Sequence, residues 1–358
     1  MGGSAISGQQ ASHSFRGSIS LNSVSKGLKP VDNVARSMSA DTGNSGAHFS
    51  LENFVLGRVI GTGSCSYARI ATCRSLDRPV VIKTFSKAQL IKSEELRHCR
   101  NELQALGSIR SPWIPRFLGS GQDQRTVFLV MDFIPGGELF RLLRTMGRLT
   151  LREVEFYAAE VFCALSDLHM WRFIYRDLKP EHLLLDCEGH LKLVDLHLTK
   201  FVKSGGKTST LCGTPEYMAP EMIERTGASY EADWWQFGIL LYELLSGKTP
   251  FYDTSPHVLY TKILTAEVRF PGFFSHSACA LISSLLNKHP KKRPTSDQIK
   301  SDPFFSAVDW PRAESKLVSP PLINRVSSPE DDSHFETFEE FEVLEEDVKV
   351  VEDYFVGF

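Results

Sequence analysis

The sequence lacks the long apolar stretches that mark membrane-spanning and secreted proteins. It contains no run of about 18 hydrophobic residues and no signal-peptide core, so we expect no transmembrane segment and no secretion. The chain starts with Met1-Gly2, but the N-myristoylation pattern needs Ser or Thr at the sixth position, where Ile6 stands. Tethering through this acyl group is therefore not expected.

Cysteine is scarce and unpatterned, and the charges of the two signs nearly balance. The seven cysteines form an odd set without short repeated spacings, which argues against a disulfide framework or a zinc site. A net charge of -3 and a pI near 6.4 give no argument for binding nucleic acid or an anionic membrane. We expect a protein of the reducing cytoplasm, or of the nucleus as well.

Composition divides the chain into three regions. Residues 1–50 are rich in Ser and Gly, show no hydrophobic period, and are predicted to be disordered. Between residues 54 and 305, strand-like apolar runs alternate with helical patterns, which predicts a folded domain. Residues 306–358 hold several prolines and then acidic residues interleaved with aromatic ones. This composition predicts an extended tail held down by its aromatic side chains.

The folded region mixes strands and helices. Apolar runs at 54–60, 80–85 and 127–133 predict strands. Apolar positions from Val154 to Leu168 follow helical spacing and predict a long amphipathic helix that leads into the segment 174–185. With 358 residues, 42% of them hydrophobic, the chain can bury the core of a two-lobed α+β enzyme or of two ordinary domains.

The turn Gly61-Thr62-Gly63-Ser64 gives the first indication of chemistry. Two glycines between apolar strands let backbone N–H groups approach a phosphate. The signal is weak alone, because a Gly-x-Gly turn also occurs in ordinary hairpins. The rest of the chain must decide between these two interpretations.

Lys83 ends the next apolar strand. An ammonium group in such a place needs an anionic partner, because burying an unpaired charge is costly. The helical pattern at 93–106 offers Glu102 as a carboxylate partner. Either residue alone would be interpreted as surface charge.

Three motifs then follow in a fixed order. Residues 175–182 have the sequence Tyr-Arg-Asp-Leu-Lys-Pro-Glu-His, residues 195–197 have Asp-Leu-His, and residues 213–221 have Gly-Thr-Pro-Glu-Tyr-Met-Ala-Pro-Glu. Their order and spacing are those of protein kinases. From Phe54 to Phe358 the chain resembles the AGC protein kinases, and among them the catalytic subunit of cAMP-dependent protein kinase. The resemblance implies a bilobal α+β fold, with a small β-rich N-lobe, a larger helical C-lobe and a C-terminal tail.

The resemblance also implies catalytic roles. Asp177 would accept or orient the proton of the substrate hydroxyl, and Lys179 would steady the transferred phosphoryl group. Asp195 would hold Mg²⁺, while Lys83, paired with Glu102, would grip the phosphates of ATP. Solvated loop carboxylates are the alternative interpretation of the two aspartates.

Four positions depart from the family motifs. His182 stands where the family has a metal-binding asparagine, and since imidazole suits softer ions than Mg²⁺, weaker binding of a second metal or a shift to Mn²⁺ is expected. His197 replaces a glycine, which would cost about 1–3 kcal/mol if its φ were positive and nothing otherwise. Leu196 replaces a phenylalanine. Ser66 replaces a glycine and should stiffen the turn over the phosphates.

An ATP pocket between the lobes is implied as well. Val81 and Ala68 exchange the side-chain sizes that the family has at these positions, which either preserves the pocket volume or reflects two unrelated changes. The residues expected to contact ATP are Ile60, Gly61, Thr62, Gly63, Ser64, Ala68, Val81, Lys83, Met131, Asp132, Ile134, Glu138, Glu181, Leu184 and Asp195.

Thr210 stands at the family's activation-loop phosphosite. The resemblance implies Arg176, Lys200 and His98 as cationic partners of its phosphate. A phosphothreonine with these partners would order the loop through charge-assisted hydrogen bonds. The alternative is that each residue is an ordinary polar surface residue.

The implied substrate is a basic peptide. Three carboxylates, those of Glu138, Glu181 and Glu243, stand where the family contacts arginines before the target hydroxyl. The pocket for a hydrophobic residue after the target would be formed by Leu211, Pro215 and Met218. An Arg-Arg-x-Ser/Thr-hydrophobic sequence is therefore expected, with solvated surface acids as the alternative.

The tail and one helix position imply further contacts. Phe335–Phe338 matches the segment that covers the adenosine, and Phe355–Phe358 matches the terminal hydrophobic motif that docks beside the helix carrying Glu102. Glu346 falls where a tail phosphosite is common. Tyr260 matches a contact with a cAMP-binding regulatory subunit, although Ser209 replaces the tryptophan that joins it in the family.

The sequence thus predicts a serine/threonine kinase of cyclic-nucleotide-type signalling that uses ATP with Mg²⁺ or Mn²⁺. Its predicted partners are basic proteins and a cAMP-binding regulatory subunit. The departures at His182, His197 and Ser66 motivate an alternative, a catalytically impaired pseudokinase that binds ATP and acts as a scaffold. A small-molecule phosphotransferase is disfavoured by the activation segment and the substrate-site acids.

Overall fold

The computed structural model describes residues 47–76, 78–203, 205–322, 326–339 and 355–358. The chain divides into the units Met1–Gly43 and Asn44–Phe358, and every structural statement below concerns the second unit. Most of the N-terminal region that was predicted to be disordered lies outside the described residues, and so does Glu346.

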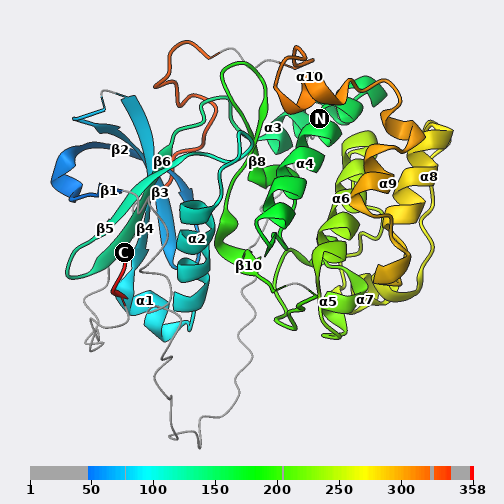
Figure 1. Ribbon diagram of the computed structural model, residues 1–358, viewed down its shortest axis with the longest axis horizontal. Helices are drawn as coiled ribbons and strands as arrows, with labels where there is room; N and C mark the ends of the chain where they lie inside the picture. Colours follow the sequence, from blue (N-terminus) through cyan, green and yellow to red (C-terminus); the bar gives the residue numbers. More distant parts are fainter. Residues whose placement is uncertain (1–46, 77, 204, 323–325, 340–354) are drawn as a thin grey trace, which may run out of the picture. The chain divides into compact units, whose positions relative to one another are not determined.

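The N-terminal part of this unit is built on a sheet with the strand order β1-β5-β6-β4-β3-β2 (Figure 1). These strands are β1 Ala47–His48, β2 Phe54–Thr62, β3 Ser66–Cys73, β4 Arg78–Ser86, β5 Phe117–Gln122 and β6 Thr126–Asp132. Two small sheets in the C-terminal part pair β7 with β10 and β8 with β9. Their strands are β7 Phe173–Ile174, β8 Leu183–Leu185, β9 Leu191–Leu193 and β10 Lys200–Phe201.

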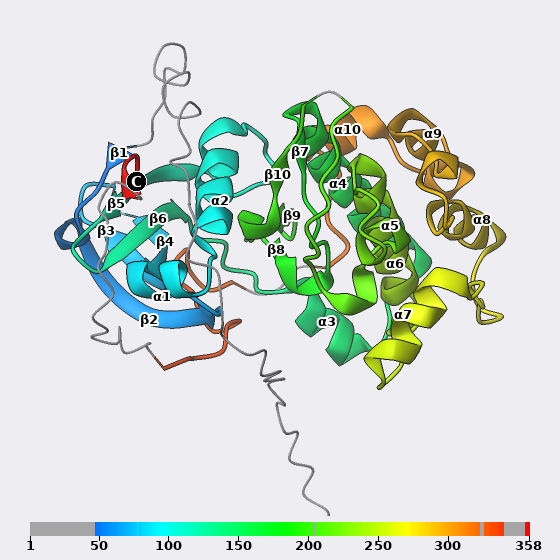
Figure 2. The same cartoon turned by 90° about the horizontal axis from the view of Figure 1, so that it is seen from below.

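Two helices accompany the main sheet, and the others form the C-terminal part (Figures 1 and 2). The first two are α1 Lys87–Lys92 and α2 Leu96–Ser108. The others are α3 Leu139–Met146, α4 Leu151–Met170, α5 Pro220–Ile223, α6 Tyr230–Ser246, α7 Pro256–Thr265, α8 His276–Leu285, α9 Ser296–Lys300 and α10 Trp310–Glu314. The predicted bilobal fold, β-rich and then helical, is confirmed.

Individual elements agree with the sequence patterns. The three predicted strands correspond to β2, β4 and β6, and the predicted helix lies within α4. Helix α4 begins at a capping box in which Thr150 and Glu153 satisfy each other's backbone N–H groups, so its start is encoded locally. The pattern at 93–106 starts too early, because α2 begins at Leu96.

Order begins before residue 50, earlier than the sequence predicted. Strand β1 pairs in parallel with β5, and the N–H of Phe49 donates to the carbonyl of Ser120 at 2.9 Å. Two glycines of β5 make this approach possible, because a Cβ at Gly119 or Gly121 would lie about 2 Å from a carbonyl oxygen of this segment. The glycine pair on β5 therefore lets the segment 47–49 pair beside it.

Successive side chains of strand β4 point to opposite faces of the sheet, so the strand lies between a small core and a cavity. Val80 and Ile82 are fully buried in a small core with Phe54 and Phe128. The alternate residues Val81 and Lys83 point to the other face, toward α2 and the cavity described below. The strand thus delivers an ammonium group into a cavity while its opposite face anchors the sheet.

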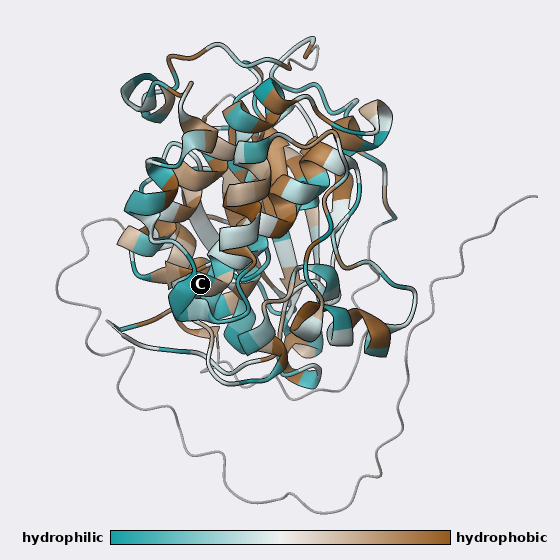
Figure 3. Ribbon diagram, turned by 90° about the vertical axis from the view of Figure 1, so that its right-hand side faces the viewer, coloured by the Kyte–Doolittle hydropathy of each residue, from teal (hydrophilic) through white to brown (hydrophobic). Residues whose placement is uncertain are grey.

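The helical part is held around α6, most of whose side chains are buried. The carboxylate of Asp233 accepts the backbone N–H groups of Tyr175 and Arg176 at 2.9 and 2.8 Å, and it pairs with His169. Figure 3 shows the helices of this part with both hydrophobic and hydrophilic stretches, as expected for helices with one buried face. None of the helices within the described ranges is long and apolar enough to span a membrane.

Candidate active site

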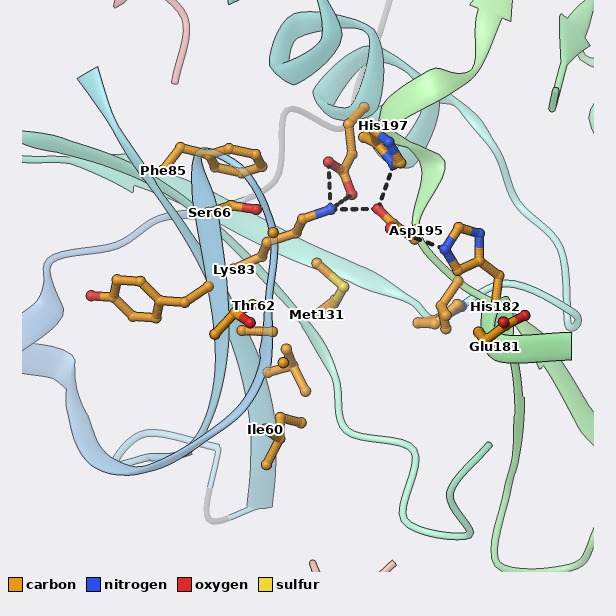
Figure 4. Close-up of a pocket in the computed structure, with 18 of the residues that line it drawn as sticks. Ile60, Thr62, Ser66, Lys83, Phe85, Met131, Glu181, His182, Asp195 and His197 are labelled. Atoms are coloured by element: carbon orange, nitrogen blue, oxygen red, sulfur yellow. Dashed lines mark hydrogen bonds and ion pairs between the residues drawn. The ribbon is translucent and has the colours of Figure 1, made fainter. Parts of the chain in front are cut away.

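A cavity of ≈ 390 Å³ opens between the main sheet and the helical part (Figure 4). Strands β2 to β4, helix α2, the hinge after β6 and the segment 179–197 contribute to its lining. Every residue that was expected to contact ATP lines this cavity, together with His182, His197 and Phe335. The volume and the mixture of apolar and charged groups suit a nucleotide.

The glycine turn above the cavity is tight. The N–H of Gly63 donates to the carbonyl of Ser66 at 2.7 Å, and a Cβ on Gly63 would lie 3.1 Å from the Ser66 hydroxyl. The tip is fastened to the segment between α1 and α2, because the Ser64 hydroxyl donates to Glu95 and the buried Cys65 thiol lies 3.1 Å from the Ser93 hydroxyl. The turn is therefore held in one conformation.

The ammonium group of Lys83 lies between two carboxylates. Its Nζ is 2.8 Å from Glu102 Oε1 and 2.6 Å from Asp195 Oδ1. Burial alone would lower the pKa of Lys83, but Asp195 and Glu102 outweigh burial and raise it. Burial raises the pKa of Glu102 despite the nearby ammonium. The predicted pair of Lys83 and Glu102 is formed in the structure.

Asp195 has an unusual backbone conformation and strong partners. Its φ of 56° lies in the left-handed region, whereas His197 is not among the residues with positive φ. The predicted condition for strain at His197 is therefore not met. The His197 Nδ1 lies 2.8 Å from Asp195 Oδ1. Burial by itself would raise the pKa of Asp195, but Lys83 and His197 hold it well below its usual range.

His182 is buried beneath Asp195. Its Nδ1 lies 2.9 Å from the carbonyl oxygen of Asp177 and 3.1 Å from the Tyr175 hydroxyl, which itself donates to the carbonyl of Val194. Its Nε2 lies 3.3 Å from Asp195 Oδ2. Burial lowers the pKa of His182, which favours the neutral ring.

Asp195 and His182, the two residues predicted to bind the metal, lie with His182 Nε2 3.3 Å from Asp195 Oδ2. Within the described residues, no group of three or more His, Cys, Asp or Glu side chains is placed to hold a metal ion. The donor set fits a divalent cation only if phosphate and water oxygens supply the remaining ligands, which is how Mg²⁺ is usually held beside nucleotides. A resident metal without nucleotide is not supported.

Asp177 lies beside the cavity and outside its lining. One oxygen accepts the N–H and the hydroxyl of Thr214 at 3.0 and 2.9 Å. Lys179 Nζ is 3.1 Å from the same hydroxyl and 3.4 Å from Asp177 Oδ2. The structure thus brings the two predicted catalytic residues into one network with the activation segment.

The three predicted substrate-site acids are partly or largely buried. Burial and the charges of Glu181 and Glu336 raise the pKa of Glu138 to about 6. Burial also raises the pKa of Glu181 and of Glu243, whose carboxylate accepts the hydroxyl of Tyr217. Three carboxyl groups with raised pKa values favour the approach of a cation.

The residues of the predicted apolar pocket differ in exposure. Leu211 is 43% exposed and Pro215 is also exposed, whereas Met218 is buried. Leu211 can therefore meet a substrate directly, and Met218 supports the surface from below.

The predicted phosphosite, Thr210, is exposed. The Arg176 guanidinium donates to the carbonyl of Leu198 and, at 3.4 Å, to the hydroxyl of Thr208. Without a phosphate on Thr210, Arg176 thus contacts the hydroxyl of Thr208, two residues before the predicted phosphosite.

Sequence reasoning missed Arg97 in the same neighbourhood. Burial lowers the pKa of Lys200, and Arg97 and Arg176 lower it further. Burial likewise lowers the pKa of His98, to which Arg97 also contributes. Arg97 therefore lies near enough to Lys200 and His98, two of the predicted phosphate partners, for its charge to act on them. Its position next to His98 on α2 was the available signal.

The tail returns to the sheet through aromatic side chains. Phe335 packs against Phe133 with ring centroids 5.6 Å apart, and Phe338 forms a bridge to Val59. Phe355 is fully buried, its carbonyl accepts from Gln122, and Lys87 Nζ lies 5.1 Å from its ring centroid. Phe355 thus contacts both the end of strand β5 and the start of helix α1.

Comparisons with known proteins match this chain to one family. The family model described as protein kinase domain matches residues 54–305. The chain is 36% identical over 323 residues to the mouse protein named cAMP-dependent protein kinase catalytic subunit PRKX, covering 88% of this chain and 90% of that protein.

Two yeast proteins are similar as well. The chain is 38% identical to cAMP-dependent protein kinase type 3 of Saccharomyces cerevisiae, with 82% of this chain and 75% of that protein covered. It is 39% identical to serine/threonine-protein kinase YPK1 of the same yeast, with 85% of this chain and 45% of that protein covered.

Proposed function

This chain belongs to the protein kinase family, and from that premise we propose that it phosphorylates serine or threonine in Arg-Arg-x-Ser/Thr-hydrophobic sequences. It is an ATP-dependent serine/threonine protein kinase with AGC relatives. The observation that carries the substrate proposal is the closeness of Glu138 and Glu243 to Glu181, because the charge of Glu181 raises the pKa of both. A guanidinium group between such carboxylates relieves their repulsion.

The residues around the cavity support a division of labour. Asp177, which accepts hydrogen bonds from Thr214, would orient the hydroxyl of the substrate and accept its proton. Lys179 lies beside it, where a cation stabilises negative charge on the transferred group. Lys83, kept in place by Glu102, is placed to grip phosphate oxygens. Protein kinases use ATP with Mg²⁺, which neutralises phosphate charge when bound.

We propose that Mn²⁺ supports this kinase better than Mg²⁺ does. Asp195 and His182 are the side chains placed for the cation, and one of them offers nitrogen. Mg²⁺ prefers hard oxygen ligands, and affinity for nitrogen donors rises along the transition series from Mn²⁺ onward, so Mn²⁺ tolerates the imidazole better than Mg²⁺ does.

The test of the proposed reaction is transfer of labelled γ-phosphate to an Arg-Arg-x-Ser-hydrophobic peptide in Mg²⁺ and in Mn²⁺. We expect turnover in both metals, higher in Mn²⁺, and none in Asp195→Ala. Exchange of both peptide arginines for alanine should raise KM about tenfold or more. Equal turnover on both peptides would contradict the substrate proposal and keep the reaction.

We predict that peptide recognition weakens in acid because of Glu138. Its pKa is raised to about 6, so the carboxylate that attracts arginine is present above that pH and lost as the pH falls through it. The kcat/KM for the arginine peptide should therefore fall below about pH 6 more steeply than that for the alanine peptide. Glu138→Gln should remove this difference and raise KM at neutral pH.

A second variant, Glu336→Gln, tests whether Glu138 causes the loss of peptide recognition in acid. Glu336 contributes to the raised pKa of Glu138, so its neutralisation should move the fall to lower pH. An unchanged profile in Glu138→Gln would show that another group causes the loss.

A scaffold that binds ATP without catalysis is the second candidate. It is favoured by the contact of His197 with Asp195 Oδ1, the carboxylate on which the cation depends. Measurable ATP binding without peptide phosphorylation in either metal, after Thr210 is shown to be phosphorylated, would select this candidate.

We propose two regulatory features. Arg176, Lys200 and Arg97, with His98 beside them, form a neighbourhood that would receive a phosphate on Thr210. Tyr260, which lies on α7, matches a family contact, and this resemblance supports the proposal that a cAMP-binding regulatory subunit inhibits the kinase in cyclic-nucleotide signalling. Action in the cytoplasm, or in the nucleus as well, remains a prediction.

A further inference from the structure

The two oxygens of Asp195 have different neighbours. Oδ1 lies 2.6 Å from Lys83 Nζ and 2.8 Å from His197 Nδ1, while Oδ2 lies 3.3 Å from His182 Nε2 (Figure 4). A carboxylate oxygen accepts through two lone pairs in its plane. With an ammonium and an imidazole N–H both donating to it, Oδ1 is fully engaged by the protein itself.

The backbone holds His197 in this position. Leu196 and Leu198, its neighbours in the short 3₁₀ turn, are both buried. The hydroxyl of Thr199 closes the turn on the carbonyl of Leu196 at 2.6 Å. The left-handed φ of Asp195 belongs to the same turn, in which the carboxylate lies within hydrogen-bond distance of the ring. The contact between His197 and Asp195 is thus built into the fold.

The other carboxylate oxygen of Asp195, Oδ2, faces the Nε2 atom of His182. The Tyr175 hydroxyl donates to the carbonyl of Val194, so it can only accept from His182 Nδ1, and the Asp177 carbonyl can also only accept. The ring proton is therefore on Nδ1, and in the neutral ring Nε2 presents its lone pair toward Asp195 Oδ2. Metal-bound histidines are commonly oriented by such a bond from their other nitrogen.

We propose that His197 is a positioning residue that reserves Oδ1 of Asp195 for the protein. As a result, the kinase holds a single divalent cation with its nucleotide, between Asp195 Oδ2 and His182 Nε2. The inference rests on the proposed function, because nucleotide phosphates supply the other ligands. Lys83 and His197 together occupy both lone pairs of Oδ1. Asp195 then binds the cation through one oxygen, and a second cation lacks the carboxylate oxygen that it needs.

The experiment counts and identifies ligands on the full-length protein, using Mn²⁺ and a non-hydrolysable ATP analogue. Mn²⁺ binding followed by electron paramagnetic resonance should reach one ion per protein. Electron spin-echo modulation should show coupling to one directly bound nitrogen. In His197→Gly, stoichiometry should rise to two ions while the nitrogen coupling remains. In His182→Asn, the nitrogen coupling should disappear.

His197→Asn is the conservative control, because its amide N–H can replace the imidazole donor and should keep the stoichiometry at one. A merely structural role of His197 would make the asparagine and glycine variants alike. Two ions in the wild type, or nitrogen coupling that survives His182→Asn and is lost in His197→Gly, would overturn the inference. Peptide turnover by a wild type with two bound ions would overturn this inference and leave the proposed function intact. Nucleotide analogue that binds equally without any Mn²⁺ would count against both.

Discussion

Replacing Asp177 by asparagine is expected to reduce peptide turnover at least about 100-fold while leaving nucleotide affinity nearly unchanged. The carboxylate is the proposed acceptor of the substrate proton, and an amide oxygen is a much weaker base. Asparagine keeps an oxygen that can accept from Thr214, so the activation segment should stay in place. Asp177 also lies outside the lining of the nucleotide cavity. Steady-state kinetics and nucleotide titration by fluorescence measure the two effects.

The matched control for this prediction is Asp297→Asn in α9, far along the chain from the motifs, which should behave like the wild type. A parallel fall in kcat and nucleotide affinity in Asp177→Asn would mean that the loop has moved and that basicity was not the cause. Turnover that stays within a few-fold of the wild type would remove Asp177 from the catalytic role.

The cavity could be predicted from sequence because its residues belong to short motifs on well-defined elements. Lys83 is placed by the alternation of β4, whose other face is fully buried, so its direction follows from the pattern Val-Val-Ile-Lys. Glu102 follows from helical spacing on α2. A buried ammonium needs such a carboxylate, and the structure has this pair at 2.8 Å. The strand and helix patterns, and the requirement of a buried ammonium for a carboxylate partner, therefore predict the same pair.

Other features depend on contacts that no local pattern specifies. His197 was predicted to carry backbone strain only if its φ were positive; the left-handed φ falls on Asp195, and the His197 ring contacts the Asp195 carboxylate instead. Arg97 was missed because its relation to Arg176 and Lys200 joins segments far apart in sequence. The pairing of residues 47–49 with β5 required knowing that Gly119 and Gly121 leave room on an edge strand.

The second large effect is expected for Asp233, which connects the core of the helical part to the active site. Its carboxylate is fully buried and accepts the backbone N–H groups of Tyr175 and Arg176, just before Asp177. Asp233→Ala leaves both donors and the ring of His169 without their acceptor. We expect the free energy of unfolding to fall by about 3–5 kcal/mol, as when one partner of a buried charged pair is removed. Guanidinium unfolding followed by circular dichroism measures the loss.

The same substitution should slow catalysis, because Asp177 is fixed through the backbone that Asp233 holds. A displacement of the catalytic loop by about 1 Å can cost about 100-fold in turnover.

Asp233→Asn is the informative intermediate, since its oxygen can still accept one N–H while its amide faces the other, and about 1–3 kcal/mol of unfolding free energy should be lost. Exposed Glu224→Gln should change stability by less than about 0.5 kcal/mol. If Asp233→Ala unfolded like Glu224→Gln while turnover still fell, Asp233 would act on catalysis without bracing the fold. If stability fell and turnover at a temperature where the variant is folded did not, the position of Asp177 would be independent of α6.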